Sequence, residues 1–130
     1  MQDILIVGAG VIGGSIAREL SKYDLDVVVI DKETDVANGT TKANSAIVHA
    51  GYDATEGTLM AKYNALGNAM FDKLSEELDF PFKRIGSLVV ANSEEERKHI
   101  EELLERGIEN NIPGVRIIEK DELQKIEPKI

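Results

Sequence analysis

The sequence contains no cysteine, and it has far fewer basic than acidic residues. Without cysteine the chain can form neither a disulfide nor a thiolate metal site, and nothing points to the disulfide-rich secreted class. Its 15 lysines and arginines face 24 aspartates and glutamates, which leaves a formal net charge of -9. Because no basic face is available for a phosphate backbone, we expect no nucleic-acid partner. We also expect no metal site.

The sequence also lacks a long apolar run of the kind found in signal peptides and membrane-spanning helices. The apolar stretch near the N-terminus is interrupted by Gly, Ser, Arg and Glu. Such a stretch is neither a signal peptide nor a membrane span. We therefore expect a soluble protein of the cytoplasm.

The most informative pattern is a glycine-rich turn between two apolar runs. Residues 4–7 (Ile-Leu-Ile-Val) lead into Gly8, Gly10 and Gly13, which have the spacing G-x-G-x-x-G. In this fingerprint the first glycine allows a tight turn, the second admits a pyrophosphate, and the third lets a helix pack closely. Asp31 follows Gly13 by eighteen residues, where an acid accepts hydrogen bonds from a ribose.

The fingerprint in this context predicts a Rossmann-like βαβ unit that binds a dinucleotide at the start of its helix. The alternative is a βαβ unit whose glycines serve packing alone, which would make Asp31 a coincidence. A complete dinucleotide-binding sheet needs more strands than 130 residues supply. We therefore expect the chain to be the N-terminal portion of a longer enzyme.

Hydrophobic periodicity predicts the remaining elements. Strands are expected at 3–7, 26–31, 83–91 and 115–118. Helices are expected at 11–22, 57–78 and 94–110, with a short last helix from about Asp121 to before Pro128 and an irregular segment at 32–55. Apolar residues of the 57–78 helix, from Leu59 to Leu78, recur at steps of three and four, so we expect this stripe to be core.

Further stretches carry a resemblance to a known family. They are a fourth glycine (Gly14), the run Gly39–Asp53 with its Asn-Ser-Ala-Ile-Val-His-Ala-Gly core, the run Arg84–Ala91, and Ile118–Leu123 followed by Ile126-Glu127-Pro128. Together they resemble the N-terminal third of flavoproteins of the D-amino-acid-oxidase-like (DAO) superfamily. Within it the chain is most similar to the anaerobic glycerol-3-phosphate dehydrogenase large subunit and the L-2-hydroxyglutarate oxidases.

The resemblance implies FAD rather than NAD, and hydride transfer from a hydroxyl-bearing carbon to the flavin. It also implies an α/β fold, a Rossmann-like FAD/NAD(P)-binding domain of the glutathione-reductase type with the beginning of an α+β substrate domain. The FAD-binding portion would span residues 1–80, and the substrate domain would begin in residues 81–130.

The resemblance assigns roles to single residues. Cofactor contacts are expected from Gly8, Gly10, Gly13, Gly14, Asp31, Lys32, Thr40, Thr41 and Ser45. For the hydroxyl side chains the alternative is ordinary loop capping. His49 is expected near the isoalloxazine as a catalytic candidate, and the alternative is a buried histidine bonded to backbone. Lys62 and Arg84 are candidate anchors for an anionic substrate, or else ordinary surface charges.

Three functions stay open from the sequence. The first is the FAD-binding part of a dehydrogenase or oxidase acting on glycerol 3-phosphate or a 2-hydroxy acid, inactive as this chain alone. The second is a NAD-binding dehydrogenase domain, which leaves Asn44–Tyr52 unexplained. The third is a non-catalytic nucleotide-binding module. For the first we expect a small anionic substrate and either a redox partner subunit or a peripheral membrane electron acceptor, with self-association through open sheet edges.

Overall fold

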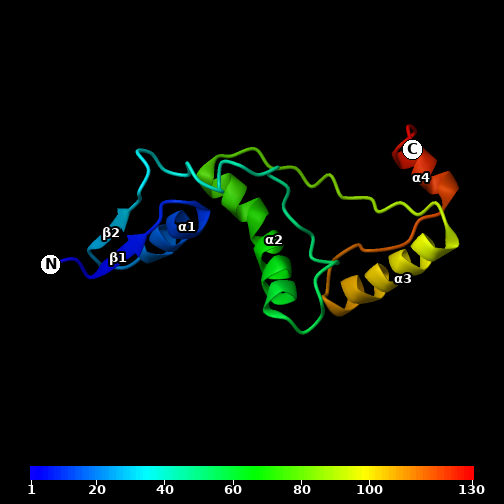
Figure 1. Ribbon diagram of the computed structural model, residues 1–130, viewed down its shortest axis with the longest axis horizontal. Helices are drawn as coiled ribbons and strands as arrows, with labels where there is room; N and C mark the ends of the chain where they lie inside the picture. The colour runs from blue at the N-terminus through cyan, green and yellow to red at the C-terminus, as the bar shows by residue number, and fades with distance from the viewer. The chain divides into compact units, whose positions relative to one another are not determined.

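The computed structural model describes all 130 residues, which form two compact units, Met1–Ile47 and Val48–Ile130. In chain order the elements are β1 (Ile4–Val7), α1 (Val11–Leu20), β2 (Val27–Ile30), α2 (Leu59–Leu78), α3 (Glu94–Glu109) and α4 (Lys120–Ile126) (Figure 1). Residue 80, the predicted boundary between domains, lies inside the second compact unit. The division into an FAD-binding and a substrate domain stays a prediction.

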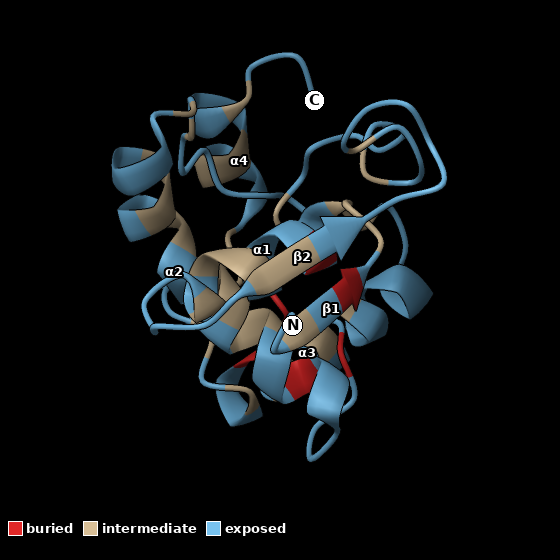
Figure 2. Ribbon diagram, turned by 90° about the vertical axis from the view of Figure 1, so that its left-hand side faces the viewer, coloured by how far each residue is buried: buried red, intermediate tan, exposed pale blue.

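The first unit is a βαβ element with two parallel strands. Ile4 pairs with Val27, and the register continues to Val7 beside Ile30. The predicted strands and helix are confirmed to within two residues at each end. Ile6 is buried against α1, whereas the side chains of the opposite face of β1 are open, with Val7 78% exposed. The sheet is therefore covered on one face only, and little of the strand surface is buried (Figure 2).

The glycine turn between β1 and α1 has two geometric requirements. Gly8 has a φ of +107°, a left-handed conformation that glycine adopts without steric cost. A Cβ on Gly13 would lie 1.8 Å from the carbonyl oxygen of Gly8. Helix α1 can therefore pack onto the end of β1 only with glycine at position 13, as the fingerprint predicts.

The second unit contains three helices joined by irregular segments, and no helix of the chain is long and apolar enough to cross a bilayer. The hydroxyl of Thr58 caps α2 by accepting the N–H of Ala61 at 3.2 Å. Helix α3 begins with a reciprocal cap: Ser93 accepts the N–H of Glu96, and the Glu96 carboxylate accepts the N–H of Asn92. The bonds to Thr58 and Ser93 satisfy amide groups that the first turn of a helix leaves without partners, and the bond from Asn92 fixes the residue before the cap.

Two predicted strands are wrong. Residues 83–91 and 115–118 contain no strand, and the only sheet of the chain is formed by β1 and β2 (Figure 1). An apolar run becomes a strand when a second strand takes its backbone hydrogen bonds. Neither run finds such a partner here. Both instead line, with α3 and α4, an apolar groove of about 980 Å³.

The apolar stripe of α2 was predicted to be core, and this prediction is wrong for most of its length. Leu59, Tyr63, Leu66 and Met70 are between 51% and 70% exposed. The side of α2 that packs is the one near Ala61, which is buried. The stripe is exposed because no segment of this chain covers it, and periodicity identifies an apolar face without saying what lies against it.

Two alanine variants test the packing of the glycine turn. In Gly13→Ala the new methyl group overlaps the Gly8 carbonyl, whereas at Gly14 a Cβ would meet nothing within 4 Å. We expect G13A to destabilise the first unit by about 3 kcal/mol, since backbone atoms must separate. We expect G14A to raise the free energy of unfolding of the first unit by about 0.5–1 kcal/mol, since alanine loses less conformational entropy than glycine inside a helix.

Amide hydrogen exchange of residues 1–47 in the three proteins measures both effects. Equal exchange in G13A and G14A would contradict the packing that the structure shows at Gly13.

Candidate nucleotide-binding site

Five of the predicted cofactor residues of the first unit line one groove. The groove has a volume of about 540 Å³ and lies where β1 ends and α1 begins. Five of the nine candidates line it: Gly8, Gly10, Gly13, Thr40 and Thr41. The carboxyl ends of parallel strands are where open α/β sheets bind their ligands, so the position is that of a nucleotide site.

Asp31 lies beside the glycine turn, one residue after β2. Its Oδ2 accepts the N–H of Ala9 at 2.6 Å, and its Oδ1 accepts the N–H of Glu33 at 2.9 Å. The bond from Ala9, followed by that from Glu33, holds the pKa of the Asp31 carboxyl below its usual value. An ionised carboxylate only accepts hydrogen bonds, and each oxygen has further lone pairs that suit ribose hydroxyls.

Thr41 closes the turn from the opposite side. Its Oγ1 accepts the N–H of Val11 at 2.9 Å, at the first residue of α1. A second tie joins the N–H of Ala37 to the carbonyl of Ala9 at 2.9 Å. The loop and the turn are thus connected at two points, and a hydroxyl stands at a helix N-terminus, where phosphate oxygens bind.

The other cofactor candidates lie outside this cluster. Gly14 faces open space on α1. Lys32 is exposed, with its Nζ 3.7 Å from a carboxylate oxygen of Glu33. Ser45 is also exposed. Their cofactor roles stay predictions.

The arrangement fits the ribose and pyrophosphate of a dinucleotide. The turn has no side chain at Gly10, and a Cβ there would already lie 2.9 Å from Thr41 Oγ1. The amino end of α1 supplies a partial positive charge for the phosphates. The ionised Asp31 suits a free ribose and disfavours a ribose 2′-phosphate, since like charges repel.

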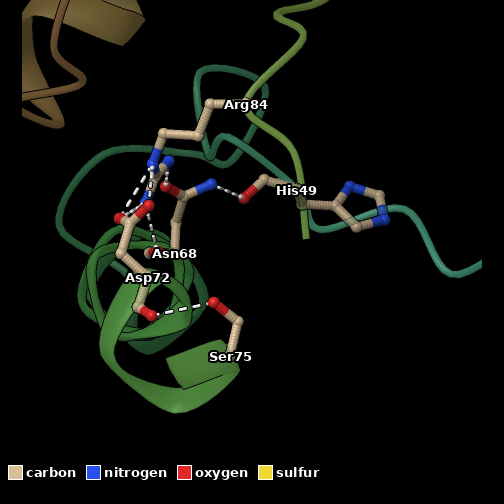
Figure 3. A network of polar contacts seen from close by, with 5 residues as sticks. All are labelled: His49, Asn68, Asp72, Ser75 and Arg84. Carbon is tan, nitrogen blue, oxygen red and sulfur yellow. Dashed lines mark hydrogen bonds and ion pairs between the residues drawn. The ribbon is translucent and has the colours of Figure 1, made fainter. Parts of the chain in front are cut away.

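His49 belongs to the second unit, and its ring is exposed. Its carbonyl oxygen accepts a hydrogen bond from Asn68 Nδ2 at 3.0 Å, while the imidazole points away from this polar network (Figure 3). The alternative of a buried histidine is therefore wrong. The ring is free to meet a ligand, and its catalytic role stays a prediction.

Arg84 is held by the protein itself. Its guanidinium makes a forked contact with the carboxylate of Asp72, and its Nη1 donates to Asn68 Oδ1 at 2.8 Å (Figure 3). The hydrogen bond between Arg84 and Asp72 lowers the pKa of Asp72 and raises the pKa of Arg84. A role as substrate anchor would require this network to open. Lys62 is exposed on α2, with its Nζ 5.6 Å from the ring centroid of Tyr63.

Sequence reasoning missed the polar residues that surround His49 and Arg84. Asn68 and Asp72 belong to no motif, and Asn110 is the last residue of the helix expected at 94–110. The one available signal was a pair of asparagines four residues apart, Asn64 and Asn68, inside an otherwise amphipathic helix.

The parallel strand pair, the glycine turn and the closing aspartate together define a dinucleotide-binding protein of the Rossmann-like class. Residues 3–130 match the family model described as FAD dependent oxidoreductase (DAO). The chain belongs to this family, whose cofactor is FAD.

Individual relatives agree with the family. A glycerol 3-phosphate dehydrogenase of Caloramator mitchellensis is 58% identical over 130 residues, covering 100% of this chain and 27% of the relative. A mitochondrial L-2-hydroxyglutarate dehydrogenase of Arabidopsis thaliana is 34% identical over 128 residues, covering 98% of this chain and 26% of the relative.

A solved structure is also similar. It is dithionite-reduced L-alpha-glycerophosphate oxidase from Mycoplasma pneumoniae with FAD bound, at a TM-score of 0.87 and 41% identity, covering 98% of this chain and 34% of that chain. The chain thus spans about a third or less of the relatives it matches. The predicted family, α/β fold class and cofactor are confirmed, and the NAD alternative is set aside.

The pH dependence of stability tests the contact between Asp31 and Ala9. Because the pKa of Asp31 is lowered from 3.8 in the folded chain, its contribution is present above that value and is lost as pH falls through the folded pKa. We expect Asp31→Asn to be less stable than the wild type at about pH 6, and the difference to shrink by about pH 2.5. Urea unfolding at both pH values measures it, and a difference of the same size at both would refute the contact.

Proposed function

We propose that this chain is the N-terminal, FAD-binding part of a flavin-dependent dehydrogenase or oxidase that oxidises glycerol 3-phosphate. The observation that carries the proposal is the groove lined by the glycine turn and Thr41, with Asp31 bonded to the same turn at Ala9, in a chain of the FAD-dependent family. Identities of 58% and 41% to enzymes of glycerol 3-phosphate, against 34% to one of L-2-hydroxyglutarate, support this substrate.

Bound FAD supplies the redox chemistry by accepting a hydride. The part of this chain is to bind and orient it. Gly8 forms the tight turn, Gly10 leaves room for the pyrophosphate, and Gly13 lets α1 pack closely on the turn. Asp31 would accept hydrogen bonds from the ribose. The remaining cofactor contacts in the proposal come from Gly14, Lys32, Thr40, Thr41 and Ser45.

His49 is the catalytic candidate of the proposal. An imidazole can hold or release a proton at neutral pH, which suits the oxidation of a hydroxyl group. Its exposed ring supports this role. For the anionic end of the substrate, Lys62 is the freer of the two predicted cations, because Arg84 is paired with Asp72.

The remaining expectations belong to the whole protein. We propose a cytoplasmic enzyme that passes its electrons to a redox partner subunit or to a peripheral membrane acceptor, and that can self-associate. Oxidation of L-2-hydroxyglutarate is the second candidate activity. It is favoured by the 34% identity that extends over 98% of this chain.

Thermal melting with each dinucleotide tests cofactor binding. A ligand that binds only the folded state, present at about 100 times its Kd, stabilises that state by about 2.7 kcal/mol. We expect the melting temperature to rise with FAD and not with NAD. In Gly10→Ala the added methyl group fills the phosphate approach, and we expect the FAD effect to disappear.

Gly39→Ala is the matched control for Gly10→Ala, since a Cβ at Gly39 would meet nothing within 4 Å. We expect it to keep the response to FAD. A response to FAD that survives in G10A, or one that is equal with NAD, would contradict the proposed site.

Anaerobic reduction of the flavin tests the substrate. In the longer protein that contains this segment, we expect glycerol 3-phosphate to bleach the flavin absorbance at least about tenfold faster than L-2-hydroxyglutarate, a difference of about 1.4 kcal/mol in barrier height. The 130-residue chain mixed with FAD should show no such reduction. The reverse order of the two substrates would support the second candidate, and turnover by the chain alone would contradict its inactivity.

A further inference from the structure

The segment that carries His49 is irregular, yet side chains hold its backbone. Residues 48–56, here called the His49 segment, contain no helix and no strand. Four carbonyl oxygens of the segment accept hydrogen bonds from side chains. The donors lie on α2, on α3 and at the C-cap of α3, and the acceptors are the carbonyls of His49, Gly51, Asp53 and Ala54. Irregular backbone on a surface usually bonds to water, so side-chain donors at four carbonyls are a specific feature.

Asn110 makes two of these bonds. Its Nδ2 donates to the carbonyl of Gly51 at 3.0 Å and to that of Ala54 at 2.7 Å. An amide nitrogen carries two protons, so each carbonyl receives its own. Arg106 adds a third donor, from Nη1 to the carbonyl of Asp53 at 3.1 Å. The end of α3 therefore holds the second half of the segment.

Asn68 holds the first half, and Arg84 sets its orientation. The guanidinium of Arg84 can only donate, so the Asn68 atom that faces Arg84 Nη1 at 2.8 Å must be the oxygen. The nitrogen then faces the carbonyl of His49, at 3.0 Å. Asp72 in turn fixes Arg84 through the forked ion pair. A chain of contacts thus runs from Asp72 to the backbone of His49 (Figure 3).

Close packing leaves the segment little freedom. Gly51 is buried at a φ of +99°, and a Cβ there would lie 3.2 Å from both Asn64 Cβ and Ile112 Cδ1. A Cβ on Gly107 would lie 3.3 Å from the Cβ of Tyr52. The segment is therefore pressed against both α2 and α3, with no space for larger residues at either glycine.

We propose that Asn68 and Asn110 are positioning residues that fix the backbone of the His49 segment so that the imidazole is presented in one place. The inference rests on the proposed function, since it takes His49 to be the residue that acts. The backbone is held, whereas the ring is exposed and points away from the network (Figure 3). Fixing a reacting group in advance removes the entropy cost of ordering it during the reaction.

Asparagine-to-aspartate variants test the proposal with minimal change in shape. Asn68→Asp keeps an oxygen for Arg84 and loses the donor to His49, and Asn110→Asp loses both of its donors. The matched control is Asn111→Asp, because the Asn111 amide bonds only to Glu109, outside the segment. We expect amide exchange of residues 48–54 to become at least about tenfold faster in N68D and N110D and to stay unchanged in N111D.

The histidine rings give a second readout. The chain has two histidines, and His99 on α3 serves as an internal reference. We expect the ring carbon-proton signal of His49 to move in N68D while that of His99 stays in place. Arg84→Lys leaves both asparagines intact but removes the fork that orients Asn68, and a smaller movement of the His49 signal is expected. This variant also serves where N68D fails to fold.

Unchanged exchange of residues 48–54 and an unmoved His49 signal in folded N68D and N110D would overturn the proposal. The signals of Gly10 and Gly13 on addition of FAD report the proposed function separately. If they respond while the His49 segment is insensitive to these variants, the positioning role fails and FAD binding stands. If they do not respond, FAD binding by the chain fails, and the exchange data still decide the positioning role.

Discussion

The contact between Gly13 and the carbonyl of Gly8 is the constraint on which the first unit depends. It sets how closely α1 approaches the end of β1, because no side chain can stand between them. That approach places the amino end of α1 beside the turn, where the Thr41 hydroxyl accepts a hydrogen bond from the N–H of Val11. Asp31 then reaches Ala9 across the same turn. The candidate groove lies at the end of β1 next to these contacts, and the fold around it has no large hydrophobic core.

The two candidate regions share one structural device: main-chain groups of an irregular segment are satisfied by side chains that come from distant positions. At the nucleotide groove an anionic acceptor, Asp31, takes an N–H of the turn. At the His49 segment neutral amides of Asn68 and Asn110 donate to carbonyls. An ionised carboxylate at the turn can accept further hydroxyl groups, whereas the carbonyls of the His49 segment need donors, which the two amides and the guanidinium of Arg106 supply.

Features that depend on neighbours in sequence could be predicted. The strands and helix of the βαβ unit followed from the glycine spacing and the closing acid, and the helix at 94–110 followed from its hydrophobic periodicity. The strands at 83–91 and 115–118 failed because pairing needs a partner that the runs themselves do not specify. The prediction that the apolar stripe of α2 is core was wrong for the same reason. The periodicity identifies an apolar face, but no segment of this chain packs against it.

Arg84 shows why a site cannot be assigned from residue type alone. A cation in the predicted substrate domain suggests an anion anchor, yet the guanidinium is paired with the carboxylate of Asp72, twelve residues earlier. What remains is geometric: the guanidinium fixes the amide of Asn68. Among the side chains of this size, an amide is the one that accepts from a guanidinium with one atom and donates to a carbonyl with the other. An aspartate could accept but not donate, and an aliphatic residue could do neither. The chemistry of position 68 therefore follows from its two neighbours, Arg84 on one side and the backbone of His49 on the other.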